Sequence, residues 1–196
     1  VVGAAKAVSD CEAAFLCVPT PQGDDGSVDL TYIEAAAREL AGTMPSETVV
    51  VNKSTVPVGS TRVVERFLER SDVAVVSNPE FLREGSAVRD FLEPDRIIIG
   101  SDDQDAANRV ASLYEGVDAP ILITDPASAE TIKYAANAFL ATKLSFVNAL
   151  AAVCEGVGAD VGDVVMGLGY DRRIGHQYLQ PGPGWGGSCF PKDTSA

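Results

Sequence analysis

Short apolar runs alternate with amphipathic stretches along the first two thirds of the chain. Continuous apolar runs of this kind are typical of strands buried on both faces, as in a parallel sheet covered by helices. We expect strands at Ala13–Val18, Thr48–Val51, Val73–Val76, Asp95–Gly100 and Ile121–Thr124. We expect helices from the capping residue Asp29 to about Ala41, at Ser60–Glu69 and at Gln104–Tyr114. The alternation predicts an α/β fold with an incomplete Rossmann-like, doubly wound parallel sheet.

Polar segments follow three of these strands, at the point where each strand ends. They are Val18–Pro21, Asn52–Pro57 and Ser77–Gly85. Doubly wound sheets bind their ligands beyond the carboxyl ends of the strands. We therefore expect the functional site in these loops and not on the helices.

The pattern changes after residue 124, where no further strand is expected. Ser128–Val157 is rich in Ala, Leu, Phe and Val, and it predicts one long, largely buried helix that carries an interface. Lys133 and Asn137 are four residues apart and therefore share a face of this helix. A short helix is expected from its cap, Asp160, to about Leu168. The sequence thus predicts two domains, residues 1–124 and 125–196.

The segment Gly182–Asp193 sets four glycines around the single tryptophan of the chain. Glycine lets the backbone approach a ligand closely. Ser188 is a candidate helix N-cap and Pro191 suits the first helical turn, so Cys189 would lie at a helix start. Backbone N–H groups and the nearby Lys192 would favour a thiolate at that position. The Gly-x-Gly-x-x-Gly match in this segment is false, because a Gln-Pro pair and not a strand precedes it.

Composition excludes several classes of protein. The chain has 196 residues, a formal net charge of -13 and no basic run, which argues against a nucleic acid or an anionic membrane as partner. Its cysteines form no Cys-x-x-Cys pair, which favours a reducing compartment, and no metal site is expected. We expect a cytoplasmic protein, since we find no signal peptide and no apolar run near 18 residues. Because the chain begins at Val1 and stops soon after its most distinctive segment, we expect it to be part of a longer protein.

Four segments together resemble one family, the UDP-glucose/GDP-mannose dehydrogenases. They are Ser54-Thr55-Val56-Pro57-Val58-Gly59, Asn78-Pro79-Glu80-Phe81-Leu82-Arg83-Glu84-Gly85, Lys133-Tyr134-Ala135-Ala136-Asn137 and Gly186-Gly187-Ser188-Cys189-Phe190-Pro191-Lys192-Asp193. Four long motifs in order are far more specific than any one of them, and the resemblance covers essentially the whole chain. The Pro94-Asp95-Arg96-Ile97 variant is most similar to the UDP-glucose members.

The resemblance implies an NAD-dependent, two-step oxidation of the C6 primary alcohol of UDP-glucose to the carboxylate. Cys189 resembles the nucleophile that captures the aldehyde as a thiohemiacetal and then holds a thioester. Lys133 and Asn137 resemble the groups that stabilise developing oxyanions. Asp193, together with Thr55, is similar to the pair that orders a water for thioester hydrolysis. A further catalytic position, Glu80, matches a second carboxylate for acid and base chemistry.

Other positions carry binding roles by the same resemblance. Those near NAD are Thr20, Thr55, Glu84 and Lys192. Those that hold the nucleotide sugar are Phe81, Leu82, Arg83, Glu84, Lys133, Asn137, Tyr178, Leu179, Gln180, Pro181, Gly182 and Gly186. Arg173 matches an arginine that the family presents across a dimer interface, so a homodimer through the long helix is implied. Residues 1–124 would then be the later part of the NAD-binding domain, and 125–196 a helical dimerisation region ending in the cysteine loop.

The chain departs from the family pattern in two respects. The βαβ unit with the true Gly-x-Gly-x-x-Gly and the family's C-terminal nucleotide-binding domain do not occur in this sequence. We therefore expect the isolated chain to show no NAD-dependent turnover and to bind NAD weakly. An acidic residue often follows the helix asparagine at position 148, whereas this chain has Ala149, which we expect to affect only packing.

Three alternatives remain open. GDP-mannose or a UDP-N-acetyl-hexosamine could replace UDP-glucose as the substrate. A cysteine hydrolase would need a histidine, and the sequence has one, His176, in an irregular segment. A non-catalytic oligomerisation fragment is the stronger rival, because the long apolar helix would form a dimer core without any chemistry.

Overall fold

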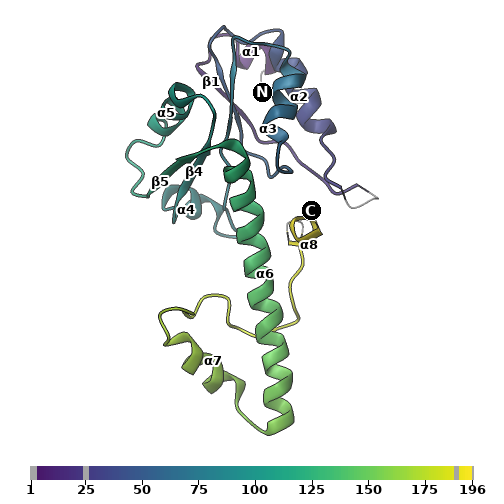
Figure 1. Ribbon diagram of the computed structural model, residues 1–196, viewed down its shortest axis with the longest axis vertical. Helices are drawn as coiled ribbons and strands as arrows, with labels where there is room; N and C mark the ends of the chain where they lie inside the picture. The colour runs from purple at the N-terminus through teal and green to yellow at the C-terminus, as the bar shows by residue number, and fades with distance from the viewer. Residues whose placement is uncertain (1–3, 24–26, 188–189, 196) are drawn as a thin grey trace. The chain divides into compact units, whose positions relative to one another are not determined.

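The computed structural model describes residues 4–23, 27–187 and 190–195 (Figure 1). The chain forms two compact units, Val1–Lys133 and Tyr134–Ala196, and helix α6 runs through the boundary between them. The elements in order are α1 (Ala4–Ala7), β1 (Ala13–Leu16), α2 (Thr31–Ala41), β2 (Val49–Asn52), α3 (Ser60–Leu68), β3 (Ala74–Ser77), α4 (Ala87–Leu92), β4 (Ile97–Gly100), α5 (Gln104–Ser112), β5 (Ile121–Thr124), α6 (Pro126–Val157), α7 (Val161–Gly169) and α8 (Phe190–Ser195).

The first unit is built on a five-stranded sheet in the order β1-β2-β3-β4-β5. β1, β2 and β3 pair in parallel, as do β4 and β5. β3 and β4 are antiparallel and pair at Ser77 and Gly100, so the expectation of a wholly parallel sheet is wrong at this pairing. A parallel connection needs a crossover segment, usually a helix packed on the sheet. The helix between β3 and β4 is α4, whose six residues include none that is buried, and the chain turns back instead of crossing over.

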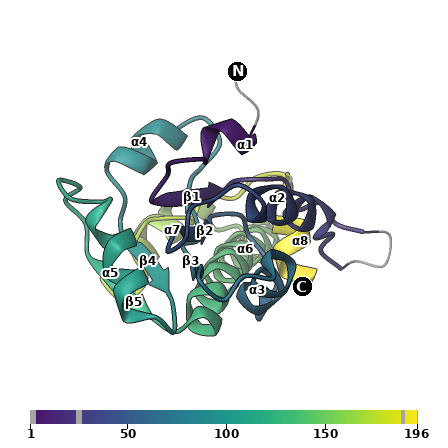
Figure 2. The same ribbon diagram turned by 90° about the horizontal axis from the view of Figure 1, so that it is seen from above.

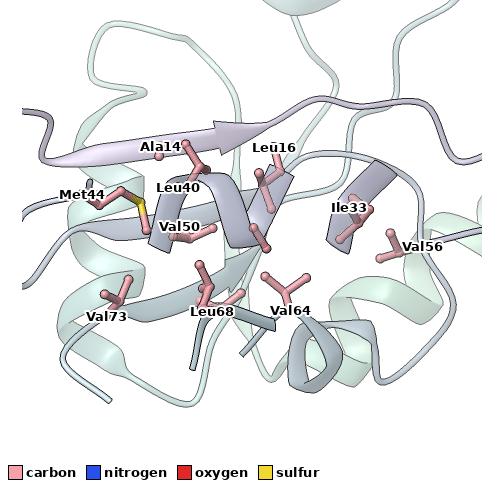
Figure 3. Close-up of a cluster of buried hydrophobic side chains, with 12 residues drawn as sticks. Ala14, Leu16, Ile33, Leu40, Met44, Val50, Val56, Val64, Leu68 and Val73 are labelled. Atoms are coloured by element: carbon pink, nitrogen blue, oxygen red, sulfur yellow. The ribbon is translucent and has the colours of Figure 1, made fainter. Parts of the chain in front are cut away.

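Helices cover both faces of the sheet, which confirms the predicted doubly wound α/β class (Figure 2). α2 and α3 pack on one face, where Val64 and Leu68 belong to the same cluster as Val50 of β2 (Figure 3). α5 packs on the other face, where Val110 joins Val51. Successive residues of β2 therefore enter opposite cores, which explains why this strand is an apolar run and not an alternating one.

Most predicted elements end within about two residues of the expected positions, which is the usual uncertainty of a helix or strand boundary. Asp29 is not the N-cap of α2, because Leu30 holds that position without a side-chain hydrogen bond. The Asp29 carboxylate instead accepts a hydrogen bond from the Thr31 amide at 2.8 Å. Asp160 caps α7 as predicted, accepting a hydrogen bond from the Asp163 amide at 3.2 Å. The short helices α1 and α4 have no predicted counterpart.

Helix α6 is continuous over 32 residues, as the sequence predicts, but it is not largely buried. Phe139, Phe146 and Val153 are 63%, 54% and 58% exposed. Apolar residues surround this helix instead of forming one stripe, so the chain itself leaves many of them uncovered. Within the described ranges, α6 is also the one helix long and apolar enough to cross a membrane, with a mean hydropathy of 1.4. The expectation that no apolar run reaches this length is therefore wrong.

Candidate functional site

The loops after β1 and β2 are joined to each other at the carboxyl edge of the sheet. The Thr20 hydroxyl donates a hydrogen bond to the Thr55 carbonyl at 2.8 Å. The Ser54 hydroxyl donates to the Val18 carbonyl at 2.7 Å. Both threonines are half-buried. The structure thus brings together two of the positions expected near a cofactor, on the edge where doubly wound sheets bind ligands.

An ion pair in the first unit joins two predicted catalytic residues. The Lys133 ammonium lies 3.0 Å from a Glu80 carboxylate oxygen, and the two side chains are 5% and 26% exposed. The other Glu80 oxygen accepts a hydrogen bond from the Leu82 amide at 2.6 Å. The Phe81 ring lies beneath two cations, with the Arg96 guanidinium 3.9 Å and the Lys133 ammonium 5.4 Å from its centroid. A cation held in this nearly water-free setting acts on nearby charge more strongly than it would in water.

Glu130, one turn before Lys133 on α6, is a buried carboxylate that sequence reasoning missed. It accepts hydrogen bonds from the Gly59 amide at 2.6 Å and from the amide and hydroxyl of Thr61 at 2.9 and 2.8 Å. Gly59 has φ of 93° and precedes α3, so the carboxylate satisfies N–H groups at a helix N-terminus. Glu130 thereby fastens the loop that contains Thr55 to the helix that contains Lys133.

A polar network beside this ion pair was also missed. Lys53 follows β2, and its ammonium donates hydrogen bonds to Asn78 Oδ1 at 3.0 Å and to the Tyr114 hydroxyl at 3.2 Å. Desolvation by burial lowers the pKa of Lys53 to about 8. Burial also raises the pKa of the Cys17 thiol. Lys53 and Asn78 both lie in segments singled out by the sequence, but nothing in their spacing indicated that they meet.

In the second unit, Asp193 is held by two other predicted residues. Its side chain is 1% exposed, and one carboxylate oxygen lies 2.7 Å from the Lys192 ammonium. The other oxygen accepts a hydrogen bond from Asn137 Nδ2 at 2.6 Å. Lys192, expected near NAD, is thus engaged with a carboxylate. Cys189 and its expected N-cap Ser188 lie outside the described residues.

The glycine-rich segment is attached to α6 by two side chains that were not predicted as site residues. Asn148 Oδ1 accepts a hydrogen bond from the Gly182 amide at 2.8 Å. Ser145 Oγ accepts one from the Trp185 indole N–H at 2.9 Å. The Trp185 ring also meets the Phe190 ring edge-on, with centroids 6.2 Å apart. These contacts hold the glycine-rich segment at Gly182 and at Trp185.

The remaining predicted positions differ in their surroundings. Arg83 forms an ion pair with Asp90 at 2.5 Å, which holds the pKa of that carboxyl well below its usual range. Arg173 pairs with Asp171 and its side chain is 88% exposed. Among these remaining positions, Leu179 is buried, at 3% exposure. Half-buried or exposed positions, by contrast, are Leu82, Glu84, Tyr178, Gln180, Pro181, Gly182 and Gly186.

His176 is engaged with the end of α7. Its ring meets the Tyr170 ring edge-on, with centroids 5.4 Å apart. The ring also lies so close to Gly169 that a Cβ on that glycine would come within 2.0 Å of Nδ1. This packing gives the histidine a structural role and weakens the hydrolase alternative.

Comparison with known proteins identifies both parts of the chain. Residues 2–118 match the NAD binding domain of the UDP-glucose/GDP-mannose dehydrogenase family, and residues 127–196 match its central domain. The chain is 49% identical over 196 residues to UDP-glucose 6-dehydrogenase YwqF of Bacillus subtilis (strain 168), covering 97% of the chain and 44% of that protein. It is 50% identical over 200 residues to UDP-glucose 6-dehydrogenase of Rhizobium meliloti (strain 1021), covering 97% of the chain and 46% of that protein. The chain spans less than half the length of these relatives.

Solved structures agree with these matches. A UDP-glucose dehydrogenase from Pyrobaculum islandicum superimposes with a TM-score of 0.94 at 46% identity, over 100% of this chain and 47% of that one. A GDP-mannose dehydrogenase from Pseudomonas aeruginosa superimposes with a TM-score of 0.79 at 35% identity, over 96% of this chain and 46% of that one. Apart from its first residue, the apolar helix α6 lies within the residues that match the central domain of this family. The chain belongs to the UDP-glucose/GDP-mannose dehydrogenase family of NAD-binding nucleotide-sugar dehydrogenases.

Proposed function

We propose that this chain carries the reacting residues of an NAD-dependent dehydrogenase that oxidises the C6 alcohol of UDP-glucose to UDP-glucuronate. The observation that carries the proposal is the buried Asp193 carboxylate, four residues after Cys189, held by Asn137 at 2.6 Å and by Lys192 at 2.7 Å. A carboxylate fixed by an amide and an ammonium can accept a proton from water without leaving its place. Thioester hydrolysis needs such a group near its cysteine.

Cofactor binding is proposed for the loops at the carboxyl edge of the sheet. Their joined, half-buried polar groups around Thr20 and Thr55 suit the nicotinamide side of a dinucleotide. We assign Glu84 and Lys192 to the same role from the family resemblance. NAD, when bound, supplies the hydride acceptor for both oxidation steps.

Each covalent step is assigned to a residue of this chain. The Cys189 thiolate attacks the aldehyde carbon, a carbon–sulfur bond forms, and the carbonyl oxygen becomes an oxyanion that Lys133 and Asn137 stabilise. Loss of a second hydride from that carbon leaves a thioester. Water then attacks the thioester, its proton passes to Asp193, and the thiolate leaves as the carboxylate product is released. We assign the exchange of the alcohol proton to Glu80, a role supported by its ion pair with Lys133.

Substrate binding and assembly are further parts of the proposal. We assign the nucleotide sugar to the backbone and side chains of Phe81, Leu82, Arg83, Tyr178, Leu179, Gln180, Pro181, Gly182 and Gly186. We also propose a homodimer through α6, with Arg173 at the interface. The dimer is supported by three exposed apolar residues, Phe139, Phe146 and Val153, which recur every seven positions and therefore share one face of the helix.

The experiment is a chimera in which this chain replaces the matching segment of the Bacillus subtilis relative. We expect NADH formation with UDP-glucose to exceed that with GDP-mannose or a UDP-N-acetyl-hexosamine. Lys133→Ala should lower kcat by about 10²-fold or more, because its charge matters most when the oxyanion develops. Lys143→Ala is the matched control, since Lys143 lies on the same helix and its ammonium contacts the Ile174 carbonyl at 3.3 Å. A folded chimera without turnover on any of these sugars would contradict the proposal, and a pure KM effect of Lys133→Ala would make that lysine a binding residue.

A further inference from the structure

In the first unit, the Lys53 ammonium donates its hydrogen bonds to neutral partners. It donates to Asn78 Oδ1 and to the Tyr114 hydroxyl, and it lies 5.7 Å from the centroid of the Tyr114 ring. The Tyr114 hydroxyl donates in turn to the same Asn78 oxygen. Among the residues that the structure describes, no carboxylate forms an ion pair with Lys53. A half-buried cation that forms no direct ion pair loses hydration without full compensation, so its place here calls for a reason beyond packing.

Asn78 is the residue through which Lys53 acts. It is fully buried, its Nδ2 donates to the Ile98 carbonyl at 2.7 Å, and its amide donates to the Asn52 carbonyl at 2.9 Å. The Asn78 side chain is thus held by the Ile98 carbonyl of β4, by Tyr114 after α5 and by Lys53 after β2. Pro79 follows with a restricted φ, and Glu80 comes next. A displacement of Asn78 would therefore be passed along this short segment to Glu80.

The charges of this region interact as a group. The groups that face Lys53 are Cys17 after β1, Glu80 after β3, Tyr114 after α5 and Lys133 on α6. Desolvation is the main cause that lowers the pKa of Lys53, the Lys133 charge adds to it, and the charges of Glu80 and Cys17 oppose it. The Lys53 and Lys133 ammonium groups are thus both attracted by one carboxylate, that of Glu80.

We infer that Lys53 is a positioning residue for the proposed reaction: through Asn78 it holds Glu80 against Lys133. This inference rests on the proposed function only for the roles given to Glu80 and Lys133. The loop after β2 thereby controls an ion pair between the loop after β3 and helix α6. A merely structural Lys53 would stabilise the fold without affecting the protonation of Lys133.

The test is NMR titration of the chain labelled with ¹³C at the lysine ε-carbons. The lysines are few, namely Lys6, Lys53, Lys133, Lys143 and Lys192, so their signals can be assigned by substitution. In Lys53→Met, we expect the Lys133 midpoint to fall by about one pH unit or more, because a buried ammonium that loses its carboxylate is harder to protonate. Lys53→Arg should restore most of the wild-type midpoint, and Lys143→Met should leave it unchanged.

The opposite outcomes separate the alternatives. If Glu80 stayed in place, removal of the Lys53 charge would raise the Lys133 midpoint, and a raised or unchanged midpoint in Lys53→Met would overturn the inference. Tyr114→Phe is a milder variant that keeps the ring and removes one hydrogen bond, so it tests the same point if Lys53→Met does not fold. It should shift the Lys133 midpoint in the same direction as Lys53→Met, and an unchanged midpoint would again overturn the inference. Because the titration needs no turnover, an inactive chimera with the expected midpoints would count against the proposed function and not against the role of Lys53.

Discussion

Replacing Glu130 should destabilise the first unit far more than its single charge suggests. Its carboxylate accepts hydrogen bonds from two amides and one hydroxyl at the start of α3. Glu130 as a whole residue is 2% exposed. A hydrogen bond to a charged group contributes about 1.5–3 kcal/mol, and a buried donor left without a partner costs about 1–3 kcal/mol. Gly59 is exposed, so its amide can donate to water once the carboxylate is removed. Thr61 is 1% exposed, so its amide and hydroxyl would be left without a partner. We therefore expect Glu130→Ala to lower the free energy of unfolding by about 3–5 kcal/mol.

The assay is urea denaturation followed by far-ultraviolet circular dichroism. With a slope of about 2 kcal/mol per molar urea, the expected loss moves the midpoint down by about 2 M. Glu130→Gln keeps one oxygen acceptor and should cost about 1–2 kcal/mol. Glu34→Ala is the control, because Glu34 forms an exposed pair with Arg38 at 3.0 Å and should cost no more than about 0.5 kcal/mol. If Glu130→Ala unfolded at the same urea concentration as Glu34→Ala, the hydrogen bonds from Gly59 and Thr61 to Glu130 would add nothing to stability, and the reasoning would be refuted.

Three further predictions concern individual side chains. Lys53 has a pKa of about 8 in the folded chain against an ordinary 10.5, so the unfolded chain binds more protons between these values. Stability in urea should therefore rise with pH across that window, and Lys53→Met should flatten the rise; an equal rise in the variant would refute this. Because burial raises the pKa of Cys17, its alkylation at neutral pH, mapped by mass spectrometry, should be slower than that of Cys189; preferential labelling of Cys17 would contradict the assignment of the reactive thiol. Ser145→Ala removes the acceptor of the Trp185 indole, so the emission of this single tryptophan should change on substitution; an unchanged spectrum would show that the hydrogen bond does not fix the glycine-rich segment in solution.

The fold could be predicted where burial leaves a pattern in the sequence. β2 is apolar throughout because Val50 and Val51 enter different cores, and the long apolar stretch could only be a helix at its length. The antiparallel pairing of β4 could not be predicted, since it depends on the direction of the chain after α4, and α4 buries none of its residues against the sheet. The exposure of α6 could not be predicted either, because composition does not show which of its apolar residues are buried by other parts of the chain.

The candidate site could be predicted only in part. Family motifs pointed to Lys133, Glu80 and Asp193. Lys133 and Glu80 form an ion pair, and Lys192 and Asn137 hold the Asp193 carboxylate. Glu130 gave no signal, because a single carboxylate in an apolar helix has no spacing relation to the helix that it caps. Lys53 stood inside a singled-out loop, but its partner Asn78 follows another strand. Contacts between strand ends depend on the order of strands in the sheet, which the spacing of residues does not specify.

The central claim is that Cys189 forms a covalent bond to the sugar and that Asp193 helps to release it. The most direct measurement is peptide mass mapping of the Asp193→Asn form of the chimera after incubation with NAD and UDP-glucose. We predict that hydrolysis becomes slow, so a nucleotide-sugar thioester accumulates on the Cys189 peptide, with two NADH formed for each adduct because two hydrides leave the carbon before hydrolysis. NADH formation with no adduct, or an adduct on Cys11, Cys17 or Cys154, would contradict the account.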